Sequence, residues 1–262
     1  MHINKSSLAG RVIPLLVLAC CLSLSSAMAA PSGMELAQSI HDRYVGDDMT
    51  SHQTMELIPV KGQTRVREME IAGADRDGLR RSLLRFTAPA DIQGTGFLTL
   101  EDGQGGTEQF LYLPALKRTR RIVAGQKSRS FVNTDFTFED MERRPVEGSE
   151  HVITGEETIG GVPCLILESV PKPQAQSQYT LIRAWVAKKM LLPLVVDFFS
   201  GGPEPVKRYT VLQLENIQDI WTETKVSMED LESGHKTTLE TKDIKYNTGI
   251  QDSVFTVQAL EQ

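Results

Sequence analysis

The sequence predicts a mainly β protein in which one amphipathic helix precedes a long antiparallel meander of strands. Apolar residues recur at a spacing of four only near residue 33, and beyond that segment they alternate with polar residues. Segments rich in Gly and Asp separate the alternating runs, as turns do in antiparallel sheets. The length of 262 residues fits one large all-β domain.

The helix is expected at residues 33–45. Leu36, Ile40 and Tyr44 form an apolar stripe, and Gly46 is a plausible stop. The stripe fits a lid over a cavity as well as an ordinary core helix, and both interpretations stay open.

The alternating runs predict strands, expected at 52–60, 64–73, 79–88, 96–102, 108–113, 118–124, 151–158, 162–170, 179–188, 193–199, 206–215, 221–231 and 235–246. Segments 72–81 and 101–109 have the composition of hairpin turns. The strands from 221 onward are mostly charged, with isolated apolar residues. They are therefore either solvated on one face or curled over a shallow cavity.

Residues 1–29 have the features of a secretory signal peptide. A positively charged start precedes an apolar run at 12–24, and small residues at 27 and 29 fit the positions that a signal peptidase reads. Cleavage is expected near Ala29–Ala30, which leaves 30–262 as a single exported domain. Lipidation at Cys20 is the less favoured alternative, because the bulky Leu18 fits a lipidation site poorly.

Charge and cysteine usage narrow the function classes. Without Lys5 and Arg11, 26 of the 28 basic side chains remain against 34 acidic ones, a net charge of −8, which argues against a nucleic-acid partner. Cys164 is then the one remaining cysteine. It permits no internal disulfide and is expected to be a small buried strand residue.

No motif points to catalysis, a cofactor or a metal. The chain has no G-x-S-x-G sequence, and its histidines are scattered singly without the spacing of a zinc site. "GTGF" at 94–97 lacks the third glycine of a nucleotide loop and leads into a strand rather than a helix. Catalytic residues, metal ligands and cofactors are accordingly expected to be absent.

Two charged segments remain to be interpreted. The basic run is either a solvated strand face or a docking patch for lipid headgroups or an acidic partner, and it consists of Lys117, Arg118, Arg120 and Arg121. In "FVNTDFTFED", at 131–140, the phenylalanines are expected to pin a strand or loop to the sheet. Asp135, Glu139 and Asp140 are expected to offset the preceding cations at the surface.

Three segments carry a family resemblance, strongest over residues 76–258. They are "GTGFLTL", "QFLYLPALKRTRRI" and "SFVNTDFTFED", and the closing "YNTGIQDSVFTVQAL" also agrees. In these the chain resembles the LolA-like outer-membrane lipoprotein-sorting protein family of Gram-negative bacteria. The resemblance implies a strongly curved antiparallel sheet, an incomplete and half-open β-barrel. The N-terminal helix and short helical elements would cover its concave face over an apolar cavity.

The functional expectation follows from this resemblance. It is a periplasmic, non-enzymatic carrier or binding protein for lipids or lipoproteins, in lipoprotein sorting or lipid export. Its partners would be an acyl chain and an inner-membrane exporter of the RND/MMPL type. The alternatives are a lipid-sensing regulatory module on the same fold and, less favoured, an unrecognised periplasmic hydrolase. The residues expected to line the cavity are Leu98, Leu100, Leu111, Leu113, Trp185, Val196, Phe198, Leu212 and Trp221.

Overall fold

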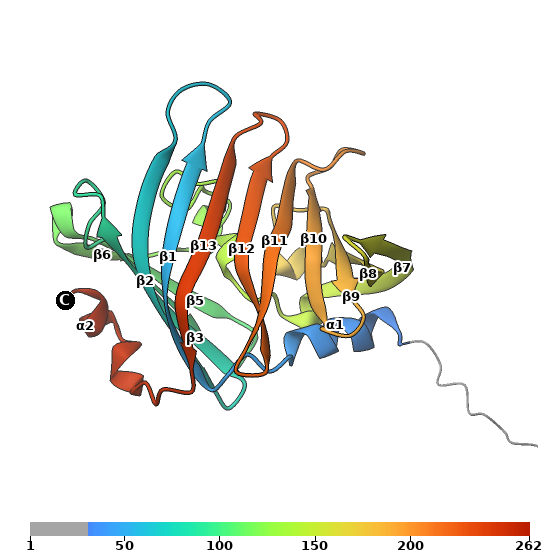
Figure 1. Cartoon of the computed structure of the whole chain (residues 1–262), viewed down its shortest axis with the longest axis horizontal. Coiled ribbons are helices and arrows are strands. Elements are labelled where there is room, and N and C mark those ends of the chain that lie inside the picture. The colour runs from blue at the N-terminus through green and yellow to red at the C-terminus, as the bar shows by residue number, and fades with distance from the viewer. Residues whose placement is uncertain (1–30) are drawn as a thin grey trace, which may run out of the picture. The chain divides into compact units, whose positions relative to one another are not determined.

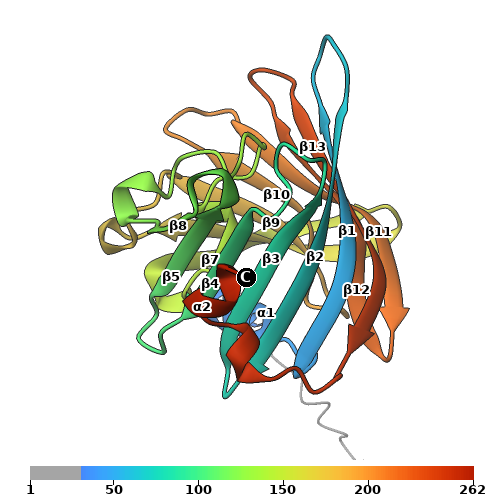
Figure 2. The ribbon, with the colours of Figure 1, turned by 90° about the vertical axis from the view of Figure 1, so that its left-hand side faces the viewer.

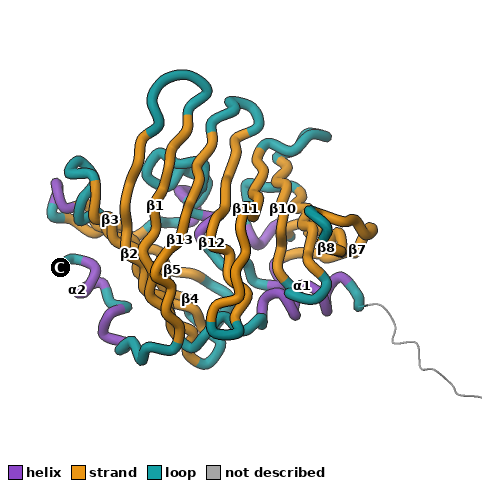
Figure 3. Tube along the Cα trace, in the orientation of Figure 1, coloured by secondary structure: helices purple, strands orange, loops and turns teal. Residues whose placement is uncertain are grey.

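The computed structural model describes residues 31–262, so the expected signal peptide and Cys20 lie outside the described residues. These residues form one antiparallel sheet of 13 strands, strongly curved and not closed into a barrel, with two α-helices (Figures 1 and 3). The predicted fold class is confirmed. The strands are β1 (Asp48–Ile58), β2 (Arg65–Arg76), β3 (Leu79–Ala88), β4 (Gly96–Glu101), β5 (Thr107–Leu113), β6 (Arg118–Arg121), β7 (Ser149–Ile159), β8 (Val162–Pro171), β9 (Leu181–Ala187), β10 (Leu192–Phe199), β11 (Lys207–Ile217), β12 (Ile220–Asp230) and β13 (Lys236–Tyr246).

Two meanders make up the sheet, in place of the single one that the sequence predicted. Strands β1 to β6 pair in chain order, as do β7 to β13, and β1 pairs with β13 to join the two sets. β6 and β7 therefore lie at opposite edges of the sheet, although they follow each other in the chain. Alternation shows that a segment is a strand, but it carries no information about a partner some 190 residues away.

Helix α1 (Gly33–His41) begins with a capping box, in which Ser32 and Glu35 satisfy each other's backbone N–H groups. Leu36 and Ala37 are buried against residues of the β7–β9 end of the sheet. The helix ends at His41 and not at residue 45. The chain then turns towards β1, which leaves Tyr44 58% exposed, outside the apolar stripe.

Helix α2 (Val257–Leu260) packs on β4, on the outer face of the curved sheet (Figure 2). Gly96 permits this contact, because a Cβ atom at that position would lie 2.6 Å from Cδ1 of Leu260. The second glycine of "GTGF" therefore serves close packing of α2 on β4.

Residues 122–148 connect the two edge strands by crossing the concave face of the sheet, and we call them the crossing segment. Phe131 and Phe138 are 1% and 2% exposed and pack on Phe97, with ring centroids 4.9 and 5.7 Å from its ring. Phe136 packs in a second cluster, with Tyr179 and Phe198. Burying each ring stabilises the fold by about 1.5–3 kcal/mol. The prediction that these rings pin the segment to the sheet is confirmed, although the segment is a loop with short 3₁₀ turns.

The Asp140 carboxylate anchors the crossing segment. It is 2% exposed and accepts hydrogen bonds from Nζ of Lys207 (2.7 Å), the Tyr179 hydroxyl (2.8 Å), and the backbone N–H and hydroxyl of Thr137 (2.8 Å each). Arg144 lies 3.4 Å away. Burial alone would raise the pKa of Asp140, but the nearby Lys207 and Arg144 charges and these hydrogen bonds hold it below its ordinary value.

The expectation that the three acids lie at the surface beside the basic run was wrong. Asp135 is buried against β13, where it accepts from Thr237 (2.6 Å) and pairs with His235 (2.7 Å). Glu139 is buried and accepts from the Ser177 hydroxyl and the backbone N–H of Gln178. The strand assumed for this segment would have pointed these acids outward; the observed turns point them at the sheet.

Replacing Asp140 by Asn is expected to lower the free energy of unfolding by about 3–5 kcal/mol, because Lys207 and Arg144 then lose a buried counter-charge. Since the pKa of Asp140 is lowered, its contribution is complete above the ordinary value of 3.8 and is lost as the pH falls below it. The gap between variant and wild type should therefore narrow in acid, as measured by denaturant unfolding at several pH values.

Glu229→Gln is the matched control, because its pair with Lys236 is half-exposed and should contribute less than about 1 kcal/mol. If both variants unfold at the same denaturant concentration, Asp140 does not anchor the crossing segment.

Candidate functional site

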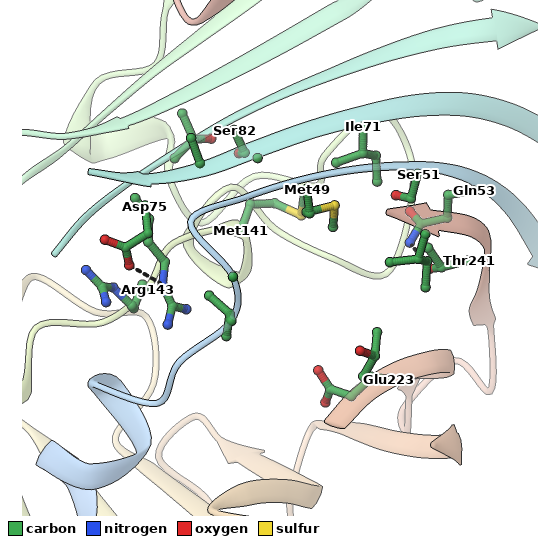
Figure 4. Close-up of a pocket in the computed structure, with 18 of the residues that line it drawn as sticks. Met49, Ser51, Gln53, Ile71, Asp75, Ser82, Met141, Arg143, Glu223 and Thr241 are labelled. Carbon is green, nitrogen blue, oxygen red and sulfur yellow. Dashed lines mark hydrogen bonds and ion pairs between the residues drawn. The ribbon is translucent and has the colours of Figure 1, made fainter. Parts of the chain in front are cut away.

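A cavity of about 600 Å³ lies between the concave face of the sheet and the crossing segment. Strands from both meanders line it, and so do Phe136, Met141 and Arg143 of the crossing segment. Figure 4 shows Met141 and Arg143 among the lining side chains. The volume is typical of sites that hold small molecules, about 300–1,000 Å³. Part of the wall is apolar and is made by Met49, Ile71, Phe136, Met141, Val226 and Leu239.

Irregular strand pairing brings additional side chains to the cavity. In β12, Glu223 and Val226 both line it, although simple alternation would put them on opposite faces. The register with β11 shifts on both sides of Gln213, which reverses the alternation between them. In β13, Leu239 and Ile244 also both line the cavity, across the register shift between β13 and β1.

Glu223 provides a carboxyl group inside the cavity. Its side chain points into the open space (Figure 4), and its Oε1 accepts a hydrogen bond from the Tyr209 hydroxyl at 3.0 Å. Burial raises the pKa of Glu223 above its ordinary value, and the hydrogen bond from Tyr209 and the nearby Arg43 charge only partly oppose this rise. Burial and the neighbouring Glu223 raise the pKa of Tyr209 in turn, so Tyr209 stays a hydrogen-bond donor.

Three arginines gather where the chain leaves α1. Arg143 binds the Glu101 carboxylate (Nε to Oε1, 2.8 Å) and donates to the carbonyl of His41 at 3.2 Å. Arg80 lies 3.7 Å from Asp75, and burial lowers its pKa. Arg43 donates to the carbonyl of Trp221 at 3.1 Å. They join the end of α1 to β3, the crossing segment and β12 beside the cavity.

Several polar atoms of the cavity wall have no hydrogen-bond partner among the described residues. They are Oγ of Ser51, Oγ1 of Thr99 and Nε of Arg80, all buried and all on lining residues. An unpartnered buried polar group costs about 1–3 kcal/mol. The wall therefore offers hydrogen-bonding groups as well as apolar side chains to a ligand in the cavity.

Among the described residues that line the cavity there is no histidine or cysteine. Among residues 31–262, no three His, Cys, Asp or Glu side chains are grouped closely enough to hold a metal ion. No helix in this range is long and apolar enough to cross a membrane. Cys164 is fully buried in β8, and burial raises the pKa of its thiol, as expected for a structural residue.

Of the nine residues expected to line a cavity, Trp221 lies on this one. The structure places Leu98 and Leu100 on the opposite face, in the cluster beneath α2. Leu111 and Leu113 pack beside Phe131, while Val196 and Phe198 pack in the cluster of Phe136 and Tyr179. Trp185 packs near Cys164 and donates to Glu157, and Leu212 is 53% exposed. Alternation identifies residues that share a face, but not which face is concave.

The four residues of the basic run lie together at the β6 edge of the sheet, and all are exposed. Arg121 pairs with Glu108 at 2.6 Å. Two large apolar side chains flank the run, Leu116 at 68% and Val123 at 56% exposure.

Sequence reasoning missed Arg43, Tyr209, Glu223 and Arg143 as cavity residues. One signal was available, because the polar strands after residue 221 were expected either to be solvated on one face or to curl over a cavity. The register shifts and the pairing of β1 with β13 depend on contacts between distant segments, and no local pattern shows them.

Comparisons with known proteins agree with this geometry. A family model described as that of an uncharacterized protein matches residues 78–262. No curated protein matches the chain.

Among solved structures, the chain is similar to a DUF1329 family protein from Desulfovibrio piger, with 29% identity, TM-score 0.82, and 87% and 97% of the two chains covered. It is equally similar to a Vibrio parahaemolyticus domain described as an outer membrane lipoprotein-sorting protein domain, with 29% identity, TM-score 0.82, and 88% and 98% covered. A LolA superfamily protein from Nitrosomonas europaea shares the fold at 18% identity and TM-score 0.68, with 88% and 100% covered. The family model covers more than half of the chain, so the chain belongs to the family of uncharacterized proteins that this model describes, and it shares its curved open sheet with these lipoprotein-sorting and LolA superfamily structures.

Proposed function

We propose that this protein is a periplasmic, non-enzymatic carrier that holds the acyl part of a lipid or lipidated protein in its cavity. The observation that carries the proposal is the cavity of about 600 Å³, with its apolar wall of side chains from both meanders and the crossing segment. Each buried CH₂ group contributes about 0.8 kcal/mol, so a chain of several methylenes is held without any covalent step. The sorting function described for the Vibrio relative supports the same class of ligand.

Cellular placement is part of the proposal. A signal peptide at 1–29 with cleavage near Ala29–Ala30 would deliver residues 30–262 as a single domain to the periplasm, and lipidation at Cys20 is the less favoured route. An inner-membrane exporter of the RND/MMPL type is the proposed partner, from which the carrier would accept its lipid.

A lipid-sensing module on the same fold would also retain lipid, whereas a hydrolase would turn it over. Native mass spectrometry of protein purified without detergent from its own periplasm is the direct test. Bound lipid of unchanged composition after incubation is expected. Protein that carries no lipid and binds no fluorescent acyl probe would refute the carrier function.

Filling the cavity should weaken binding of the acyl chain without harming the fold. Ser51 lines the cavity opposite Ile71, and its buried hydroxyl has no partner, so Ser51→Phe places a ring in the space proposed for the acyl chain. Displacing two methylenes costs about 1.6 kcal/mol, so the affinity for a fluorescent fatty acid should fall at least about tenfold in a titration.

His52→Phe is the matched control, because His52 is the next residue of β1 and is exposed on the other face. It should bind the probe as the wild type does. Equal affinities of the two variants would place the acyl chain outside this cavity.

We further propose that the β6 edge docks on an anionic membrane surface. Its exposed cations attract acidic headgroups by about 1 kcal/mol each, and the flanking Leu116 and Val123 can enter the interface. Arg118 and Arg120 form no ion pair with any described residue, whereas Arg121 is paired with Glu108.

Reversing two of these charges, in Arg118→Glu with Arg120→Glu, should lower co-flotation with phosphatidylglycerol vesicles by more than about tenfold. Acyl-probe binding should not change, because neither residue lines the cavity. Lys188→Glu with Lys189→Glu changes the net charge equally at the turn between β9 and β10. If this control loses as much flotation, net charge rather than the β6 edge is responsible.

A further inference from the structure

The charged side chains of the cavity wall are unevenly paired. Ten of the lining residues are charged, and eight of them have an opposite charge close by. The pairs that account for these eight are Arg143 with Glu101, Arg80 with Asp75, Arg81 with Asp252, Asp48 with Arg76, Asp140 with Lys207 and Glu142 with Lys127.

The remaining two are Arg43 and Glu223, which form no ion pair with any residue of 31–262. Arg43 uses one guanidinium nitrogen on the carbonyl of Trp221, and Glu223 accepts only from the hydroxyl of Tyr209. The positive charge of Arg43 lowers the pKa of Glu223, although the two side chains form no ion pair. The cavity therefore presents one cation and one carboxyl at separate points of its wall.

Both side chains are only partly exposed to solvent, and a charge removed from water is most stable when it is paired and hydrogen-bonded. A ligand with two opposite charges on one headgroup would pair both at once, while its acyl chains cover the apolar wall. We propose that the cavity binds a zwitterionic phospholipid, whose phosphate contacts Arg43 and whose ammonium group contacts Glu223. This inference rests on the proposed carrier function and specifies its ligand class.

The chemistry of Arg43 and Glu223 indicates which charged group of the headgroup each side chain would bind. The guanidinium fork of Arg43 suits the oxygens of a phosphate and keeps nitrogens free for it. An ionised Glu223 accepts only, and an ammonium group donates up to three hydrogen bonds. Oγ of Ser51 and Oγ1 of Thr99, both without partners, can serve the ester and phosphate oxygens of the same molecule.

Variants at these positions should fold. In Glu223→Gln the amide oxygen can still accept from Tyr209, and no buried ionisation remains. Because the pKa of Glu223 is raised, the wild type loses stability as the pH rises from 4.5 through that raised pKa. The groups facing Glu223 are Tyr209, Arg43 and Tyr246. The variant should therefore unfold at the same or a higher temperature than the wild type at pH 7.5.

The test uses three lipids with identical acyl chains: phosphatidylethanolamine, phosphatidylglycerol and diacylglycerol. Each displaces a fluorescent fatty acid from the purified protein at pH 7.5. The wild type should bind phosphatidylethanolamine about tenfold more tightly than either of the others. Glu223→Gln should reduce the preference for phosphatidylethanolamine over phosphatidylglycerol to less than about threefold. Arg43→Gln should reduce the preference of both phospholipids over diacylglycerol.

Glu229→Gln, on the same strand but outside the cavity, is the control and should keep the wild-type preferences. If Glu223→Gln keeps the wild-type preference for phosphatidylethanolamine, the headgroup assignment is wrong. If all three lipids bind equally to the wild type, the zwitterion site is refuted while the carrier function stands. Failure of the fluorescent fatty acid itself to bind would overturn the carrier function together with this inference.

Discussion

The buried carboxylate of Asp140 is the interaction on which the rest of this structure depends. An open sheet of 13 strands leaves the apolar side of its curve without a second sheet to cover it. The crossing segment supplies that cover, and Asp140 fixes it to β11 through Lys207 and to Tyr179 through the phenol hydroxyl. Phe131, Phe136 and Phe138 then occupy defined places among side chains of both meanders. Because the Asp140 carboxylate is buried, the two cations that pair with it are as necessary for holding the crossing segment on the sheet as the three phenylalanine rings are.

This arrangement also explains why a cavity remains. The crossing segment fills the concave side over the two aromatic clusters and leaves a space beside the end of α1, where Arg43, Arg80 and Arg143 gather. The register shifts of β12 and β13 turn extra side chains towards that space. Most of its charges are neutralised within the protein, and Arg43 and Glu223 are the exceptions. The few polar atoms that lack partners make it selective for a ligand with polar groups.

The two faces and the edge of the sheet thus have different tasks. The concave face holds the core and the cavity, and the outer face of β4 is covered by α2. The β6 edge is short and carries exposed cations, which also discourages pairing with the edge of another sheet. For a carrier these features are compatible, because binding inside the curve and docking at the edge use separate residues. A mixed polar and apolar wall also limits how tightly a lipid is held, and a carrier must release its load.

Most of the secondary structure and the family resemblance could be predicted from the sequence. Strict alternation and turn composition located the strands, because these properties depend on neighbouring residues. A hairpin such as that between β2 and β3, where Asp77 and Gly78 have positive φ, is specified by its own two residues. The phenylalanines at 131–140 also pointed to buried positions correctly. The composition of that segment suggested a solvated role for Asp140, however, and its burial depends on Lys207, which is 67 residues away in the chain.

Tertiary structure alone decided which side of each strand faces the cavity. Leu98 and Trp221 both belong to well-predicted strands, yet Leu98 packs beneath α2 and Trp221 lines the cavity. The sense of curvature, the pairing of β1 with β13 and the register shifts settle this. The roles of Glu223 and Arg43 arise in the same way, since a charge is recognised as unpaired only when all its neighbours are in place. Alternation with a period of two divides the residues of a strand between two faces. It does not show which of these faces lies on the concave side of the folded sheet.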